Sequence, residues 1–399
     1  MRRQLIFFVL FVLLLPTLGR TEELGRPESA AKRLYQEGQY TEIIKSLGGK
    51  ADVDAQEALY LGLSYLRTGD QSKAIIAWKQ YVQIDPGSEG SREVSKYLTL
   101  LLQEEAKRTA REILQQEKQI AVGKIDAKAI AVSPFENLGH QTYAPLSKGL
   151  AEMIITDLSK VKTLKVVERV QLKALLDELK LSQSGLVDAK SAPRVGKLLG
   201  AGKITTGSFL DLDQEKLRLD AAVTQTESGK SLTNSEVHGE LPTFYRLEKE
   251  LVFKILCGIG HCPESLDSQT KAAVETIHTR NFKAFRLYSQ GLEYLDQAKY
   301  REASRSFFLA VEEDPEFELA RKALLDTPLF PLDLTAMISG AEKIGDGGTA
   351  ILAAGPFFAA PQIPQSTDGH QVMAPSIGML TPPTPSPSNT VPVNIRVQF

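Results

Sequence analysis

The chain has 399 residues and a formal net charge of −2, with 47 Lys and Arg residues against 49 Asp and Glu residues. Because the basic residues are interspersed with acidic ones, the sequence lacks the clustered positive charge that is typical of a nucleic-acid-binding protein. The length allows two or three domains, each with a core of its own.

The first residues have the layout of a secretory signal peptide. Arg2 and Arg3 precede the apolar run Leu5–Leu15, and small residues follow, so we expect residues 1–19 to be removed after Gly19. At about 11 residues, the run is shorter than the roughly 20 that span a bilayer as a helix. A retained membrane anchor is the alternative, and the absence of a Cys directly after the run argues against a lipid anchor.

An internal repeat is the clearest signal in residues 27–88. The positions at helix-turn-helix spacing are Leu61, Gly62, Tyr65, Gly69, Asp70, Ala74, Trp78 and Pro86. Gly62 allows a close helix approach, Trp78 fills the groove, and Pro86 ends the second helix. These residues resemble a tetratricopeptide repeat, although Tyr81 stands where that family usually has a small residue.

A second copy lies in residues 271–325, with Ala298 where the first copy has Gly69. Its matching positions are Gly291, Tyr294, Tyr300, Ala303, Phe307, Ala310 and Pro315. A weaker unit precedes the first copy, with Ile43 at the crossing position; its positions are Ala31, Leu34, Gly38, Tyr40 and Leu47. An ordinary antiparallel helix pair is the alternative interpretation of every unit.

Such repeats are normally stacked in groups of about three, because one unit cannot bury its apolar face alone. The later copy therefore either packs back on the earlier ones, or each group is capped by neighbouring helices. Two helices are available as caps, one at Arg92–Gln119 and one at Phe317–Leu325. The first, within residues 92–120, also links the repeats to the next domain.

Residues 126–263 change to alternating strand and helix signals. The expected strands are 128–134, 164–168, 203–210, 216–226 and 232–240, and the expected helices are 146–160, 170–179, 193–199 and 244–256. This order predicts an α/β domain whose mixed sheet is parallel at first and antiparallel afterwards. The whole chain is thus an α/β domain flanked by all-α helical repeats, followed by a disordered Pro-rich tail.

Several blocks of this domain carry a resemblance to a known family. They are Ala131–Leu138, Gly149–Leu158, Val166–Arg169, Leu181–Val187 and Val195–Ala201, followed by the strand containing Ile204–Ser208. Together they resemble the curli production assembly/transport (CsgG-like) family and the related TolB amino-terminal and FlgO-like domains. The resemblance covers about a third of the chain and implies a role in the bacterial envelope.

The same family includes curli secretion channels, whose barrels need long inserted hairpins with strands of about 9 to 11 alternating residues. The connections here are the short segments 211–215 and 227–230. Without such hairpins or a lipidation Cys, the sequence favours a relative that is not a channel.

The α/β domain contains few residues whose type and position indicate a binding or catalytic role. Glu168 and Arg169 lie where a strand ends and a helix begins, so they form a candidate functional turn, although helix capping and local pairing are the simpler roles. Glu152 and Asp157 lie on one helix, and we expect them on its solvated face. The segment Gly200–Gly202 predicts the end of a helix followed by a tight turn. We predict no catalytic residue, cofactor or metal ligand.

The only two cysteines, Cys257 and Cys262, are close in sequence. A pair like this in an exported protein usually forms a local disulfide. Free thiols and a metal site using His261 are the alternatives, but zinc wants about four ligands.

Residues 326–399 form a Pro-rich tail, which we expect to be mostly disordered from Asp326 to Thr390. Its last residues, Val391 to Phe399, alternate apolar and polar side chains and predict a strand. That strand would add to a partner's sheet edge or dock on the chain's own α/β domain.

These features favour a non-enzymatic interaction scaffold of the periplasm, peripheral to the outer membrane, that supports assembly or transport of an envelope component. Its partners would be envelope proteins bound in the grooves of the repeats, and a homo-oligomer remains open. The alternatives are a curli-type secretion channel subunit and an envelope ligand-binding sensor or enzyme.

Overall fold

We analysed a computed structural model of the chain. It describes residues 29–119, 125–179, 187–188, 190–212 and 216–348. The predicted signal peptide, most of the Leu181–Val187 block, and the tail beyond residue 348 with its terminal strand lie outside these residues.

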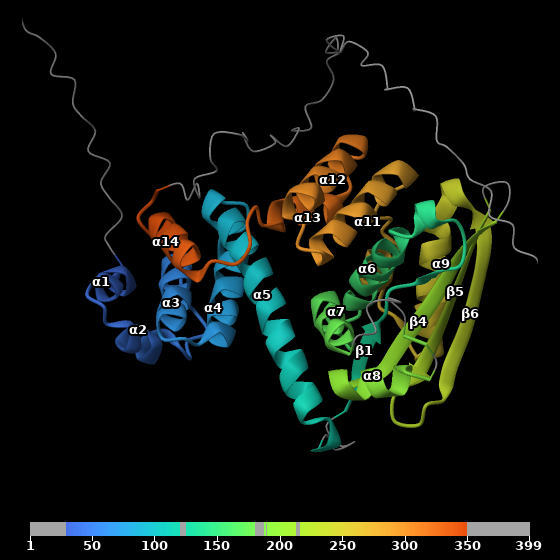
Figure 1. Cartoon of the computed structure of the whole chain (residues 1–399), viewed down its shortest axis with the longest axis horizontal. Helices are drawn as coiled ribbons and strands as arrows, with labels where there is room; N and C mark the ends of the chain where they lie inside the picture. Colours follow the sequence, from blue (N-terminus) through green and yellow to red (C-terminus); the bar gives the residue numbers. More distant parts are fainter. Residues whose placement is uncertain (1–28, 120–124, 180–186, 189, 213–215, 349–399) are drawn as a thin grey trace, which may run out of the picture. The chain divides into compact units, whose positions relative to one another are not determined.

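The amino-terminal part consists of helices (Figure 1). In chain order they are α1 (Ala30–Gln36), α2 (Tyr40–Leu47), α3 (Ala55–Arg67), α4 (Gln71–Ile84) and α5 (Glu89–Gln115). Asp54 begins α3 with a capping box, since its carboxylate accepts from Glu57 N at 2.8 Å while Glu57 accepts from Asp54 N at 3.1 Å. Gly69, at a φ of +84°, then turns the chain into α4.

The predicted helix pairs lie at the predicted positions. A Cβ atom placed on Gly62 would lie 2.2 Å from Trp78 Cδ1, and one placed on Gly291 would lie 2.4 Å from Phe307 Cε1. Each glycine therefore lets an aromatic ring of the second helix contact the backbone of the first. Membership of the tetratricopeptide family stays a prediction, because antiparallel helix pairs of other families also pack closely.

The other residues predicted to pack within these helix pairs differ in how far they are buried. Leu61, Tyr65, Ala74 and Trp78 of the first pair are buried, as are Ala303 and Phe307 of the second. Tyr294 is partly buried, and Pro86 and Pro315 are exposed just after the ends of their helices. In the weaker unit, Ile43 is fully buried and Gly38 turns the chain at a φ of +75°.

The middle of the chain forms a mixed sheet, as predicted. Its strands are β1 (Asp126–Val132), β2 (Glu136–Asn137), β3 (Lys165–Val166), β4 (Ala201–Leu212), β5 (Lys216–Gln225) and β6 (Ser231–Glu240). The order is β3-β1-β4-β5-β6, with β2 also paired to β4. Strand β1 is parallel to β3 and β4, whereas β4, β5 and β6 are successively antiparallel.

Helices cover the sheet on both faces. They are α6 (Leu146–Ser159), α7 (Arg169–Glu178), α8 (Ala192–Leu199) and α9 (Phe244–Gly258). Successive residues of β1 divide between the faces: Ile130 and Val132 pack in the core with α6 and α9, while Ala129 and Ala131 pack in a core with α7 and α8. Figure 1 shows α9 alongside β5 and β6. Gly200 ends α8 at a φ of +65°, which confirms the predicted helix stop.

The helices after the sheet are α10 (Ser268–Glu275), α11 (Phe282–Asp296), α12 (Tyr300–Glu313), α13 (Glu318–Asp326) and α14 (Leu334–Gly345). The α11/α12 pair shares the core of the sheet, α6 and α9 and is flanked by α13. Helices α12 and α13 each contact α5, because the Tyr300 hydroxyl of α12 donates to Gln103 Oε1 at 3.2 Å and Thr99 donates to the Asp326 carbonyl of α13 at 2.9 Å. The later pair is therefore flanked by α13 and contacts α5, the helix predicted to cap the earlier repeats and to link them to the next domain.

Helix α14 corrects the prediction of disorder from Asp326 onward. It begins with Asp333, whose carboxylate accepts from Thr335 N at 2.9 Å. Met337 and Ala341 are buried against α3 and α5, in the same core as Trp78. The Pro and Gly content of the tail hid a short amphipathic segment at its start. Elements α10 and β2 were also not predicted.

The turn between α11 and α12 carries backbone strain. Ala298 has a φ of +55°, in the left-handed region that favours glycine. We expect Ala298→Gly to raise the free energy of unfolding by about 0.5–1 kcal/mol, since it removes roughly 1–2 kcal/mol of strain and costs some backbone entropy. Urea unfolding would measure the change. Gly69→Ala, at the matching turn of the first pair, should destabilise the chain, and a loss of stability in Ala298→Gly would contradict this account.

Candidate functional site

The predicted turn residues Glu168 and Arg169 lie at the start of α7, but they neither cap the helix by a side-chain bond nor pair locally. Glu168 accepts from Lys79 of α4 at 3.1 Å. Arg169 extends to α11 and α6: its Nη1 lies 2.6 Å from Asp296 Oδ1 and its Nε lies 3.1 Å from Glu152 Oε2. The expectation of local pairing is therefore wrong, because these partners come from helices distant in sequence.

Arg169 is the centre of a partly buried set of charges that we call the Arg169 cluster: Lys148, Glu152, Arg169, Glu293 and Asp296. Lys148 lies 2.9 Å from Asp296 Oδ2 and 2.7 Å from Glu293 Oε2. The side chains of Arg169 and Asp296 are only 16% and 7% exposed. Burial alone would lower the pKa of Arg169, but the negative charges of Asp296 and Glu152 raise it, so the guanidinium stays charged.

A cavity of about 360 Å³ lies beside this cluster. It is lined by Pro134, Lys148, Arg169, Leu172, Lys173, Leu176, Asp177, Glu293, Asp296 and Gln297. The volume is near the lower limit for a small-molecule site. Lys173 is paired with Asp177, and Lys148 with Asp296, so the lining cations already have carboxylate partners. The cavity therefore gives no preference for an added anion.

A second buried set, the Asp157 cluster, consists of Asp157, Lys160, Glu248, Lys249 and His278. It joins α6 and α9 to the segment between α10 and α11. Asp157 is fully buried; it accepts from Lys160 Nζ at 2.7 Å and from His278 Nε2 at 2.9 Å, and it also pairs with Lys249. The expectation of a solvated helix face for Glu152 and Asp157 is therefore wrong, and the two carboxylates belong to separate clusters.

The surroundings of the two carboxyl groups in this cluster shift their pKa values in opposite directions. Burial raises the pKa of Asp157, but the hydrogen bond and charge of His278 and the charge of Lys249 lower it to about 2. Burial, and then the negative charge of Asp157, raise the pKa of Glu248 well above its usual range. Neither Glu248 oxygen has a hydrogen-bond partner among the described residues. Burial lowers the pKa of His278.

Asp157, Glu248 and His278 each offer one metal-ligand atom within 4.8 Å of the others. However, the Lys249 ammonium already pairs with Asp157 and lies 3.4 Å from Glu248 Oε2, and Lys160 adds a second positive charge. The chain therefore supplies its own cations at this place, and a divalent ion would have to displace them against their charge.

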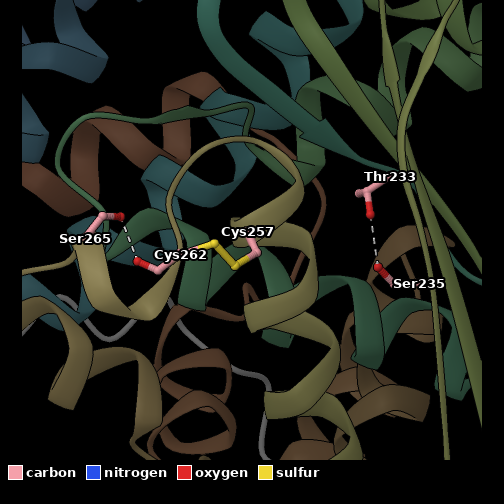
Figure 2. Close-up of a disulfide and its surroundings, with 5 residues drawn as sticks. All are labelled: Thr233, Ser235, Cys257, Cys262 and Ser265. Atoms are coloured by element: carbon pink, nitrogen blue, oxygen red, sulfur yellow. Dashed lines mark hydrogen bonds between the residues drawn. A yellow bond between two sulfur atoms is a disulfide. The ribbon is translucent and has the colours of Figure 1, made fainter.

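Cys257 and Cys262 are joined by a disulfide at the end of α9 (Figure 2). The segment is further held by Ser265, whose hydroxyl donates to the Cys262 carbonyl at 2.7 Å. The bond closes a loop with a sequence separation of 5, so it contributes stability by restricting the unfolded chain.

We expect the variant Cys257→Ser/Cys262→Ser to lose about 2 kcal/mol of unfolding free energy, as loop-closure entropy predicts for so short a loop. Urea unfolding with and without reductant would measure it. Reductant should destabilise the native chain by the same amount and leave the variant unchanged. Alkylation of both thiols in the unreduced, unfolded native chain would contradict the disulfide.

Within the described ranges, neither cluster places a nucleophile beside a free base. Tyr288 lies near Arg169 and Glu152, but burial raises its pKa well above its usual range. None of the described helices combines the length and the apolar character needed to cross a membrane.

Of the residues in the two clusters, the sequence indicated Arg169 as a candidate site residue. It gave no indication of Lys148, Glu248, Lys249, His278 and Asp296, since their roles depend on contacts between distant segments.

Comparisons with known proteins point to one family in the middle of the chain. The model of the family "Curli production assembly/transport component CsgG" matches residues 102–221. No curated protein matches the chain. Among solved structures, the chain is similar to the LpoB C-terminal domain from Salmonella enterica, at 16% identity and a TM-score of 0.24, over 34% of this chain and 94% of that one.

Proposed function

We propose that the chain is a non-enzymatic interaction scaffold of the bacterial envelope that supports assembly or transport of an envelope component. The match of residues 102–221 to a curli assembly and transport family supports the envelope role. The observation that supports the scaffold role is the presence of the Arg169 and Asp157 clusters, which attach the α11/α12 helix pair to the α/β domain. The surfaces of the helix pair and of the α/β domain are therefore held next to each other, where partners can bind them.

The exposed face of α4 supports a role in binding. Ile76 is 67% exposed and Ile84 is 43% exposed on this helix. Large apolar side chains with this exposure are candidates for contact with another protein, although single ones are common on any surface.

Site-specific photo-crosslinking in intact cells tests the proposal. A crosslinker at Ile76 should give discrete adducts with proteins that carry export signals, while one at exposed Lys128 of β1 should give none. Equal adducts from both positions, or none from either, would contradict binding through the helices.

A curli-type secretion channel subunit is the second candidate, and the family match favours it. Fractionation with a carbonate wash separates the two. Release of the chain from membranes supports the peripheral scaffold, and retention in the membrane supports the channel subunit. A ligand-binding sensor or enzyme would instead require a small molecule that stabilises the chain in a thermal-shift screen.

A further inference from the structure

Helix α14 lies on one face of the amino-terminal helices, formed by Tyr35 of α1, Tyr60 and Arg67 of α3, and Tyr97 of α5. We call this the tyrosine face. A Cβ atom on Gly340 would lie 2.1 Å from Tyr97 Oη, and one on Gly345 would lie 2.4 Å from Tyr60 Oη. Helix α14 therefore approaches the two tyrosines closely because it carries glycines at these points.

The same face recognises a carboxylate. Glu342 of α14 accepts from the Tyr35 hydroxyl at 2.7 Å and from Arg67 Nη2 at 2.7 Å, and Arg67 Nε donates to the Tyr35 hydroxyl at 3.1 Å. A second pair joins Lys32 Nζ to Asp346 Oδ1 at 2.9 Å. Charge-assisted hydrogen bonds of this kind select for an acidic residue at a defined position on a helix.

Helix α14 covers this face incompletely. Met337, Gly340 and Ala341 are buried, whereas the larger side chains Ile338 and Ile344 are only partly buried against the same core. The buried Tyr97 hydroxyl beneath Gly340 has no hydrogen-bond partner among the described residues. The segment that leads to α14 exposes Leu329 and Phe330 at 41% and 37%, and the first residue of α14, Leu334, is 37% exposed. A helix that buried more apolar surface and satisfied Tyr97 would bind better.

We propose that the tyrosine face is a binding site for a helical segment of a partner protein, and that α14 is an internal occupant that the partner displaces. The partner helix carries a carboxylate for Arg67 and Tyr35 and small residues opposite Tyr60 and Tyr97. The proposal rests on the scaffold function, since displacement matters only in a chain that binds partners. In addition to the scaffold function, it assigns a role to α14, which covers the tyrosine face until the partner helix binds.

Exchange of α14 tests the proposal in the full chain, with a fluorescent synthetic peptide of residues 331–348 as the probe. Glu342→Lys places a cation against Arg67 and should release α14, so the peptide should bind this variant at least about tenfold more tightly than the native chain. Lys343→Glu changes a neighbouring exposed residue and should bind like the native chain. The double variant Arg67→Glu/Glu342→Lys restores the opposite charges and should return to weak binding.

Limited proteolysis gives a second measurement. Chymotrypsin should cut at Phe330 faster in Glu342→Lys than in the native chain, with the midpoint of thermal unfolding of the remaining core nearly unchanged. If Glu342→Lys fails to fold, Gly345→Leu serves the same purpose, because its side chain would overlap Tyr60. Equal peptide binding to the native chain and to folded release variants would overturn the proposal.

Three further outcomes are distinguishable. A native dimer that Glu342→Lys dissociates, measured by size exclusion with light scattering, would overturn the partner commitment and make α14 of a second copy the occupant. Failure of peptide exchange while crosslinking still captures envelope proteins would overturn the tyrosine face and keep the scaffold function. Successful exchange without any crosslinked partner would overturn the scaffold function.

Discussion

Replacing Arg169 by methionine is expected to lower the free energy of unfolding by about 3–5 kcal/mol, because it leaves buried carboxylates without their cation. Asp296 is 7% exposed and would keep only Lys148, while Glu152 would lose its ion-pair partner. Methionine retains much of the volume, so the loss reports mainly on charge. Urea unfolding followed by circular dichroism measures it.

Arg194 provides the matched control. Its guanidinium pairs with Glu117 through two hydrogen bonds of 2.7 and 2.9 Å, but its side chain is 54% exposed. Exposed pairs contribute little, so Arg194→Met should change stability by less than about 1 kcal/mol. Similar losses in the two variants would show that burial of the Arg169 cluster does not determine its contribution.

Replacing Asp157 by asparagine is expected to cost a similar amount, about 3–5 kcal/mol, because it removes the anion that Lys249 needs in the interior. The Lys249 side chain is 10% exposed, and Lys160 and His278 would also lose their shared acceptor. Urea unfolding at pH 7 would measure the loss. A change of less than about 1 kcal/mol would mean that Glu248 takes over as the counter-ion.

Glu248→Gln is the control within the same cluster, and it predicts a pH dependence. Because the pKa of Glu248 is raised in the folded chain, the native state holds a proton that the unfolded state releases. This contribution is complete below the usual carboxyl pKa and is lost as the pH rises toward the folded value. Glutamine cannot release the proton, so the variant should gain stability relative to the native chain as the pH rises above the usual carboxyl pKa.

The measurement is the difference between the two unfolding free energies at each pH, which removes contributions common to both chains. His278 acts in the opposite direction, since its lowered pKa makes stability fall toward acid. It is present in both chains and therefore largely cancels. A difference that does not vary with pH would mean that Glu248 is already ionised in the folded state.

The fold was predictable where the signals are local. Gly62 and Trp78 are separated by a fixed helical spacing, and the alternation of strand and helix between residues 126 and 263 predicted the sheet and its change from parallel to antiparallel pairing. Helix α14 was not predicted, because the Pro and Gly content of the tail indicates disorder. Leu334, Met337, Ile338 and Ala341 have the spacing of an amphipathic helix, and Asp333 precedes them as a cap.

The charge clusters were less predictable, because a charged residue on an amphipathic helix usually faces water. Asp157 lies 92 positions from Lys249 and 121 from His278, so no local pattern could reveal them as partners. One signal was present. Asp157 lies one turn from Met153 and next to Leu158, within the apolar stripe of α6, where an unpaired carboxylate would be costly.

Helix α5 has a further consequence for how the chain responds to force. Its first half packs Val94 and Leu101 into the core of the amino-terminal helices, while Ala106 and Ala110 pack against α7 and α8. A load applied to the amino-terminal helices would therefore pass along one continuous rod into the sheet. Because α5 contributes side chains to both cores, pulling it out of one core would also disturb the other.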